Sequence, residues 1–233
     1  MRIYNIADLY VSLECAERTM KRAEKYYLTD SDINPDISIK TTPEEIADIY
    51  RPDWTEEVKA YVYEGKLFYS ELARRFNGMM IHSSAVVLDG NAYLFSAPSG
   101  TGKSTHTRLW LQKFENRAYI LNDDKPAVRI MPDGIFVYGT PWSGKDDVSI
   151  NEKAPLKGIC FLNRDKTNWI KTMDTESKVV NLYHSAIKKV DKEVALKQLD
   201  IIENIIKKIP IYEMGCNISE ESVEVSYNKM FYG

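Results

Sequence analysis

Residues 84–104 have the sequence Ser-Ala-Val-Val-Leu-Asp-Gly-Asn-Ala-Tyr-Leu-Phe-Ser-Ala-Pro-Ser-Gly-Thr-Gly-Lys-Ser. Two short apolar runs, 84–88 and 92–95, flank Asp89-Gly90-Asn91, and an Asp-Gly pair is typical of a hairpin turn because it tolerates positive φ. The second run leads directly into a glycine-rich segment, and residues 103–114 have the pattern of a helix. This stretch therefore predicts a β-hairpin, a loop and a helix in succession.

The loop, residues 97–104, fits the phosphate-binding pattern [Ala or Gly]-x-x-x-x-Gly-Lys-Ser. Gly100 and Gly102 would let backbone N–H groups turn toward phosphate oxygens, and the following helix would present its positive N-terminus to them. Lys103 would then lie along the β- and γ-phosphates, and the Ser104 hydroxyl would ligate Mg²⁺. A tight strand-to-helix turn without a ligand is the alternative, but the position between strand and helix favours nucleotide binding.

Asp123 and Asp124 end a predicted buried strand, 118–121, that follows the helix of the loop. In an open α/β sheet, strand ends on this side face the ligand crevice. Two adjacent carboxylates there can divide their work, one for a metal ion and one for a proton. The sequence does not say which aspartate does which, and a solvated turn before Pro126 is the other interpretation.

Three further residues are weaker candidates for contact with a substrate. The segment 139–145, Gly-Thr-Pro-Trp-Ser-Gly-Lys, combines flexibility, the aromatic face of Trp142 and the charge of Lys145, which suits a mobile lid beside the acceptor; a plain surface turn fits equally well. Arg164 follows a predicted strand, 156–162, and is the nearby arginine that could carry charge toward a phosphate or an acceptor.

Histidines beside apolar stretches are more often core residues than catalysts, which applies to His82, His106 and His184.

The rest of the chain predicts a mixed α/β fold. Residues 1–80 are expected to form an N-terminal α+β layer, and residues 81–233 a core with C-terminal helices. The layer would contain an extended run at 9–13, a helix at 19–28, a second extended run near 37–39 and a helical region over 43–80. The core would add a hairpin at 127–138, helices at about 174–189 and 191–208, a strand at 211–214 and a last helix from 219.

Composition excludes several classes of protein. The 233 residues are 44% hydrophobic and carry a net charge of −3, as in an ordinary globular chain without a dominant affinity for nucleic acid or an anionic membrane. The three cysteines form no C-x-x-C pair, and no apolar run approaches membrane-spanning length. We therefore expect a soluble cytoplasmic protein; whether it forms a homo-oligomer is left open.

The order of these features resembles a known group of enzymes. His82 before a hairpin, then 99–104, then Asp123-Asp124 at a strand end is similar to the catalytic core of HPr kinase/phosphorylase and of ATP-dependent phosphoenolpyruvate carboxykinase. In that group a hairpin, not a strand of a parallel sheet, precedes the phosphate loop. The resemblance covers about residues 79–165, and 122–126 with 139–145 resemble a bacterial set of uncharacterised HPr-kinase-like proteins.

The resemblance implies a phosphoenolpyruvate carboxykinase/HPr kinase C-terminal-like nucleotide-binding core. It implies an ATP- and Mg²⁺-dependent phosphotransferase that moves the γ-phosphoryl to a hydroxyl of a peptide serine or of a small metabolite. By the same resemblance Ser104 and Asp124 serve the metal, Asp123 is the base, and His82 assists near the phosphoryl. The residues that would bind the triphosphate are Ser99, Gly100, Thr101, Gly102, Lys103, Ser104 and Thr105.

Two alternatives remain at this stage. One is a nucleotide-binding regulatory module with little or no turnover. The other is a decarboxylating carboxykinase, which is less supported because the arginine and lysine set for oxaloacetate is not recognisable in this sequence. The glutamate-containing metal segment of HPr kinase is not recognisable either.

Overall fold

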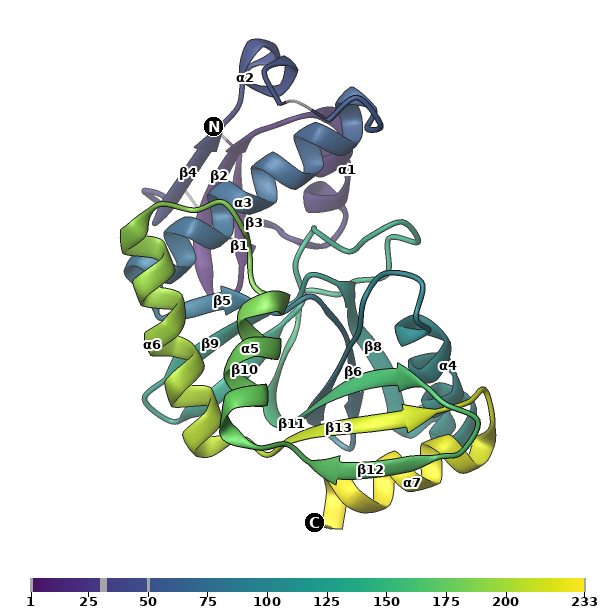
Figure 1. Cartoon of the computed structure of the whole chain (residues 1–233). Coiled ribbons are helices and arrows are strands. Elements are labelled where there is room, and N and C mark those ends of the chain that lie inside the picture. Colours follow the sequence, from purple (N-terminus) through teal and green to yellow (C-terminus); the bar gives the residue numbers. More distant parts are fainter. Residues whose placement is uncertain (1, 30–32, 50, 233) are drawn as a thin grey trace.

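The computed structural model describes residues 2–29, 33–49 and 51–232, and within them two sheets share one chain (Figure 1). The smaller sheet has the strand order β3-β1-β2-β4 and carries three helices. These elements are β1 (Ile3–Ile6), β2 (Leu9–Glu14), α1 (Glu17–Tyr26), β3 (Leu28–Thr29), β4 (Ile37–Lys40), α2 (Pro43–Ala47) and α3 (Glu56–Phe76). We call this part the N-terminal layer.

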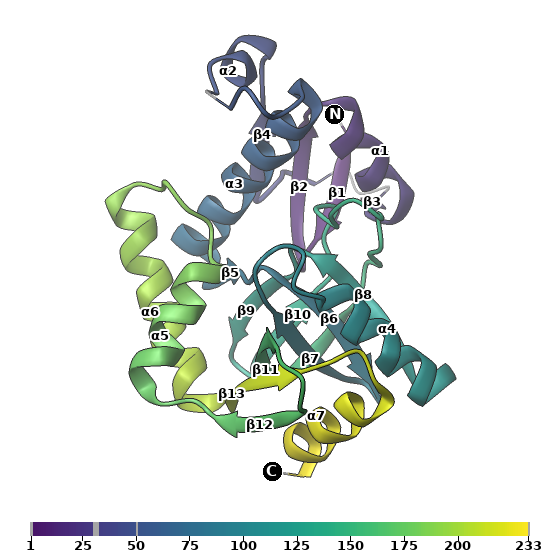
Figure 2. The same cartoon turned by 45° about the vertical axis from the view of Figure 1, so that its right-hand side comes forward.

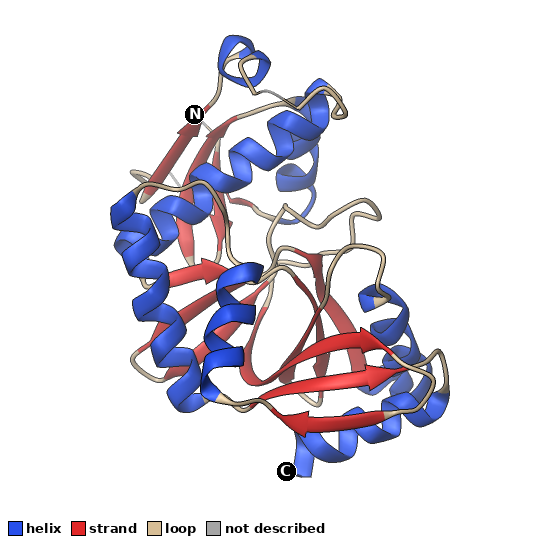
Figure 3. Cartoon of the chain, in the orientation of Figure 1, coloured by secondary structure: helices blue, strands red, loops and turns tan. Residues whose placement is uncertain are grey.

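The larger sheet follows in the chain. Its strands are β5 (Gly78–Met80), β6 (Ser83–Leu88), β7 (Asn91–Ser96), β8 (Ala118–Asp124), β9 (Ala127–Met131), β10 (Gly134–Tyr138), β11 (Lys153–Arg164), β12 (Trp169–Thr172) and β13 (Ile211–Cys216). Its helices are α4 (Lys103–Phe114), α5 (Thr175–Ser185), α6 (Lys192–Lys208) and α7 (Glu220–Tyr232), with a short 3₁₀ turn at Glu115–Arg117. The alternation of helices and strands is visible in Figure 3.

Strand β11 joins the two halves of this larger sheet. Its first residues pair antiparallel with β10, and its later residues pair in parallel with β7 and β13. One face of the β6, β7, β11 and β13 region is covered by α4 and α7, and the other by α5 and α6 (Figures 1 and 2). Parallel and antiparallel pairs therefore occur in one sheet with helices on both faces, which confirms the predicted mixed α/β class.

The predicted hairpin is confirmed in detail. Strands β6 and β7 pair antiparallel with Leu88 opposite Asn91, so that only Asp89 and Gly90 form the turn. Both have positive φ, 48° and 76°. Two consecutive residues with positive φ are typical of the tight turn whose twist matches a hairpin, which is why an Asp-Gly pair occurs here.

The structure differs from the sequence prediction in three places. The helical region over 43–80 is divided into α2, α3 and β5, because Asn77 ends α3 in the left-handed conformation and Thr55 caps a new start. The chain also begins with a hairpin, β1–β2, whose turn residues Ala7 and Asp8 have positive φ without a glycine. Strand β12 was not predicted.

A single hydrophobic cluster runs from the N-terminal layer into the larger sheet. It includes Tyr4 and Val11 of the layer together with Val87, Leu94 and Ile211 of the sheet. The domain boundary at residue 80 therefore stays a prediction, since packing is continuous across it. In the described part of the chain, no helix combines the length and the apolarity needed to cross a membrane.

Within the layer, a buried carboxylate ties α3 to the start of α1. Glu64 has no exposed surface and accepts hydrogen bonds from the Ala16 N–H at 2.6 Å, from the Thr19 hydroxyl and from the Thr41 hydroxyl at 3.1 Å. Buried polar groups that are fully hydrogen-bonded add specificity, whereas removal of one partner leaves the others unsatisfied.

We expect Glu64→Leu to lower the free energy of unfolding by about 3 kcal/mol, because one buried and two half-buried donors would lose their acceptor. Glu203→Leu is the control, since Glu203 is exposed on α6 and pairs there with Lys207; its cost is expected to stay within about 0.5 kcal/mol. Urea denaturation measures both. Equal costs would show that the Glu64 contacts contribute little.

Candidate functional site

The segment 97–104, which has the phosphate-binding pattern, connects β7 to α4, so its predicted place between a strand and a helix is confirmed. Gly100 and Gly102 have φ of 78° and 126°, and a Cβ on either would meet no atom within 4 Å. Glycine is therefore required here by backbone conformation rather than by space. Gly102 occupies the position before the first turn of α4, where no side chain caps the helix. The N–H groups of that turn are thus available to an anion.

A cavity of about 380 Å³ lies against this loop. Its walls come from four places in the sequence: the residue before β6, the loop with the start of α4, the end of β8, and the segment after Trp142. The lining residues are His82, Ser99, Gly100, Gly102, Lys103, Ser104, Thr105, Asp123, Asp124, Gly144, Lys145 and Asp146. Most of the candidate residues named from the sequence therefore meet in one cavity, which we call the phosphate pocket.

Lys103 is almost completely buried at the base of the loop. Its ammonium donates a hydrogen bond to the Ala97 carbonyl at 2.9 Å. Burial lowers the pKa of this amine, and the nearby charges of Asp124 and Asp123 oppose that shift. The side chain is thus held inside the loop, where a phosphate oxygen would compete with the carbonyl for it.

The two aspartates have different partners. The Ser104 hydroxyl donates to Asp123 Oδ1 at 3.1 Å, which links the start of α4 to the end of β8. Asp124 lies opposite Ser83 in the β6–β8 register, and its Oδ1 is 3.1 Å from His82 Nε2. The histidine thus meets a carboxylate because it directly precedes β6.

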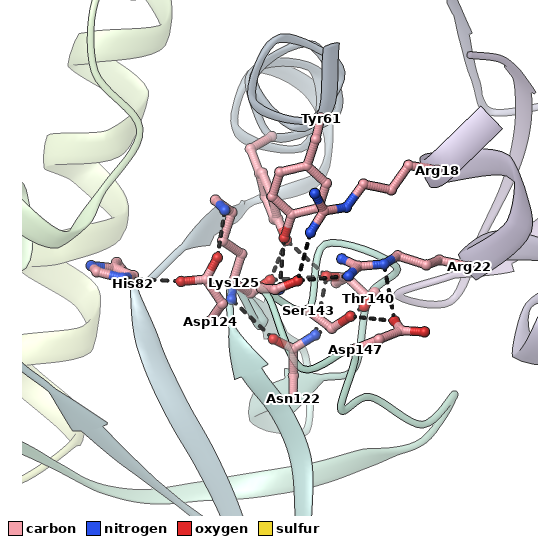
Figure 4. Close-up of polar contacts among 12 residues, drawn as sticks. Arg18, Arg22, Tyr61, His82, Asn122, Asp124, Lys125, Thr140, Ser143 and Asp147 are labelled. Carbon is pink, nitrogen blue, oxygen red and sulfur yellow. Dashed lines mark hydrogen bonds and ion pairs between the residues drawn. The ribbon is translucent and has the colours of Figure 1, made fainter. Parts of the chain in front are cut away.

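Lys125 is the second partner of Asp124, with 2.5 Å between Nζ and Oδ2. Burial of Asp124 would raise the pKa of its carboxyl group, but the hydrogen bond from His82 and the charge of Lys125 outweigh it and hold the pKa well below its usual range. Asp124 is therefore ionised at neutral pH and already carries two partners. Figure 4 shows the row of His82, Asp124 and Lys125.

The loop that contains Gly144 is held from the N-terminal layer (Figure 4). The Gly144 N–H donates to the Tyr61 hydroxyl at 2.8 Å, and its carbonyl accepts from Arg22 at 2.6 Å and from Arg18 at 3.1 Å. Arg22 also pairs with Asp147 at 3.1 Å. This loop is therefore anchored on α1 and α3, where the sequence suggested a free lid.

Gly144 also packs on the aspartate pair. Its φ is 77°, and an added Cβ would lie 2.8 Å from the Asp123 carbonyl oxygen and 2.9 Å from Asp124 Cβ. Close by, the buried Asn122 side chain donates to the Thr140 carbonyl at 2.9 Å and accepts from the Lys125 N–H at 2.9 Å. The segments 122–126 and 139–145 thus contact each other directly.

Trp142 is not a substrate contact, and that prediction is wrong. The side chain is completely buried, stacks on Phe68 of α3 with 4.9 Å between ring centroids, and lies against Gly65. Trp142 is part of the hydrophobic core because α3 packs over it. Lys145, in contrast, is exposed and lines the phosphate pocket, as expected.

Arg164 does not line the phosphate pocket. Its guanidinium donates to the carbonyls of Gly100 and Thr101, so it supports the phosphate loop from outside. It lines, with Thr101, a neighbouring cavity of about 450 Å³. Arg164, which the sequence suggested as a contact for a phosphate or an acceptor, therefore binds the backbone of the loop instead.

The other two histidines do not belong to the site. His106 is buried against Phe95 and Ser226, and burial lowers its pKa to about 4. His184 is exposed on α5. The interpretation of these residues as non-catalytic is consistent with both positions.

Four residues of the site were not found from the sequence: Lys125, Tyr61, Arg18 and Arg22. Lys125 directly follows the aspartates and carries a signal in hindsight, since a cation beside two carboxylates pairs with one of them. Arg18 and Arg22 are one helical turn apart, so they share a face of α1. Tyr61 had no signal beyond its place in an apolar helical pattern.

Among residues 2–29, 33–49 and 51–232, no group of three or more His, Cys, Asp or Glu side chains could hold a metal ion by itself. Mg²⁺ does not need such a group when a nucleotide is present, because it takes one or two carboxylates with water and phosphate oxygens. The Ser104 hydroxyl beside Asp123 fits that requirement.

Comparison with known proteins gives a family and a remote likeness of fold. A family model described as SynChlorMet cassette protein ScmC matches residues 65–225. No curated protein matches. One similar solved structure is the Hpr(Ser) kinase/phosphatase from Coxiella burnetii, with 10% identity, a TM-score of 0.36, and coverage of 64% of this chain and 95% of that chain. The matched family differs from the HPr kinases and carboxykinases that the sequence resembles.

We expect Gly144→Ala to destabilise the fold more than Gly90→Ala, although the two glycines have nearly the same φ. The Gly90 change adds only backbone strain, about 1–2 kcal/mol, because its Cβ would meet nothing within 4 Å. The Gly144 change adds a clash with the aspartate pair, for about 1–3 kcal/mol more. Thermal unfolding of the two variants measures the difference. Equal losses would contradict the close packing of this loop on Asp123 and Asp124.

Proposed function

The chain belongs to the family described as SynChlorMet cassette protein ScmC, and we propose that it is an ATP- and Mg²⁺-dependent phosphotransferase. One observation carries the proposal: the phosphate loop, the Ser104–Asp123 contact and the His82–Asp124 pair all face one pocket. A phosphate cradle, a metal position and an oriented base are the parts that phosphoryl transfer needs.

The phosphate loop would bind the triphosphate. The N–H groups of the first turn of α4 and the Lys103 ammonium face the negative charge of the β- and γ-phosphates. Lys145, across the pocket, adds a second cation near the transferred group. Since phosphoryl transfer depends on positioning and charge stabilisation, these groups supply most of the catalysis.

For the metal we propose Ser104 with Asp123. A Mg²⁺ ion held there would supply positive charge against the charge that develops during phosphoryl transfer. The Ser104 and Asp123 oxygens lie side by side at 3.1 Å, whereas Asp124 is already engaged by His82 and Lys125. The family resemblance instead implies Asp124 for the metal and Asp123 for the base.

For the proton we propose His82 as the base. In this role His82 Nε2 would donate to ionised Asp124, which can only accept and lies 3.1 Å away, and Nδ1 would receive the acceptor's proton. In the step, the acceptor oxygen bonds to the γ-phosphorus, the bond from that phosphorus to the β,γ-bridging oxygen breaks, and ADP leaves with the electron pair. The acceptor's proton moves to Nδ1, and Asp124 stabilises the imidazolium.

We expect Lys103→Ala to weaken ATP binding by about tenfold or more, the cost of one lost charged hydrogen bond to phosphate. Lys113→Ala, at the other end of α4, is the control and should keep the affinity of the unchanged protein. Titration with a fluorescent ATP analogue and measurement of phosphate release compare them. If Lys103→Ala bound the ATP analogue as tightly as the unchanged protein, this loop would not be the phosphate site. If the unchanged protein bound ATP tightly but did not turn it over, the protein would be a regulatory module instead.

The two aspartate roles are separable. Asp123→Asn is expected to raise the Mg²⁺ concentration needed for half-maximal turnover, by about tenfold, because a neutral amide holds the ion less well. Asp124→Asn is expected to lower kcat by about 10²-fold with little change in the Mg²⁺ requirement, since it no longer orients His82. The opposite pattern would restore Asp124 as the metal ligand and Asp123 as the base.

A further inference from the structure

The N-terminal layer contains a second cavity, of about 690 Å³, which is larger than the phosphate pocket. It lies between the start of α1, the chain from Thr41 into α2, and the start of α3. The residues around it are Cys15, Ala16, Glu17, Arg18, Lys21, Thr41, Pro43, Ile46, Glu56, Glu57 and Ala60. None of these residues lines the phosphate pocket. We call this cavity the layer groove.

The layer groove and the phosphate pocket meet at one wall. Arg18 lines the groove and donates to the carbonyl of Gly144, which lines the phosphate pocket. Tyr61 directly follows the groove residue Ala60 and accepts from the Gly144 N–H. Arg18 and Tyr61 are seen together at this wall in Figure 4. A molecule in the groove is thus separated from the phosphate pocket by the thickness of a few side chains.

The geometry of phosphoryl transfer favours an acceptor that approaches from the side of the N-terminal layer. The cavity beside Arg164 shares Gly100, Gly102 and Thr105 with the phosphate pocket, so there is room beyond the loop for the rest of a nucleotide. Attack on the γ-phosphorus occurs in line with the leaving oxygen, from the end opposite the nucleotide. His82, Asp124 and Gly144 line the phosphate pocket but not the cavity beside Arg164. The N-terminal layer binds Gly144.

The charges in the layer groove favour one class of occupant. Lys21 is paired with Glu17 at 2.6 Å, and Arg18 lies 3.9 Å from Glu57. A small anionic metabolite would need converging cations that lack carboxylate partners. A surface with both signs of charge around apolar and backbone groups, such as Ala16, Pro43 and Ile46, instead matches a polypeptide segment with mixed side chains.

We propose that the layer groove binds a polypeptide segment that carries the acceptor hydroxyl, so that the N-terminal layer is the acceptor-recognition part of the protein. This rests on the phosphotransferase function proposed above and selects the peptide hydroxyl from the two acceptor classes considered there. The segment continues from the groove past Arg18 and Gly144, and its serine or threonine hydroxyl reaches His82.

The chain offers a matched pair of variants for the test. Lys21 and Lys207 are both exposed helical lysines, and each pairs at 2.6 Å with a glutamate four residues earlier. Only Lys21 lines the groove; Lys207 lies on α6. Lys21→Glu and Lys207→Glu therefore cause the same loss of an ion pair and the same change in net charge at two places. Neither residue belongs to the proposed catalytic machinery.

The experiment incubates an array of serine- and threonine-containing peptides of varied charge with γ-labelled ATP and Mg²⁺. We expect the unchanged protein to label a subset, and Lys21→Glu to lower labelling of peptides with an acidic residue at one fixed distance from the hydroxyl by at least about fivefold. Lys207→Glu should label the original subset. All three proteins should hydrolyse ATP at the same rate within about twofold.

Each remaining outcome counts against the proposal. If Lys21→Glu keeps the original labelling pattern, the groove does not select the acceptor. If the unchanged protein hydrolyses ATP but labels no peptide, the acceptor is not a polypeptide, and the phosphotransferase proposal survives for a small metabolite. If the unchanged protein neither binds nor hydrolyses ATP, the proposed function itself fails and this inference falls with it.

Discussion

Gly144 has no side chain, yet three parts of the molecule meet at it. Its N–H and its carbonyl are both bound by the N-terminal layer, and its α-carbon lies against the aspartate pair at the end of β8. Any larger residue would push the loop away from the carboxylates. The residues that line the phosphate pocket belong to the core, but the N-terminal layer holds one of them, Gly144, in place through its backbone.

This arrangement uses buried charge for positioning. Arg22 has little exposed surface, but its guanidinium binds the Gly144 carbonyl and Asp147. Moving an arginine out of water costs several kcal/mol, and the cost is offset only where its hydrogen bonds are well made. Glu64 follows the same rule in the layer, where three donors surround its carboxylate. The contacts of Glu64 tie α3 to the start of α1, and those of Arg22 tie α1 to the loop that contains Gly144.

The sequence predicted the parts of the fold that have local causes. The β6–β7 hairpin followed from its Asp-Gly turn, and the phosphate loop from two glycines ahead of Lys103. The meeting of His82 with Asp124 depends on strand register, which the sequence does not reveal, although both residues were named as candidates. Trp142 was misplaced because a local pattern of glycine, aromatic and cation carries no information about α3, which covers it. Arg18, Arg22 and Tyr61 were missed for the same reason, since they act across more than 80 residues of sequence.

The position of β11 in the sheet has a consequence for synthesis of the chain. Its residues Ile159–Arg164 pair in parallel with Ile211–Cys216 of β13, and the intervening segment includes α5 and α6. A ribosome adds about 5–20 residues per second, so β11 emerges seconds before the partner that completes its edge. During that interval an open strand edge is exposed, a condition that promotes pairing with other chains. Early contact with a chaperone would therefore matter most while residues 165–210 are being made.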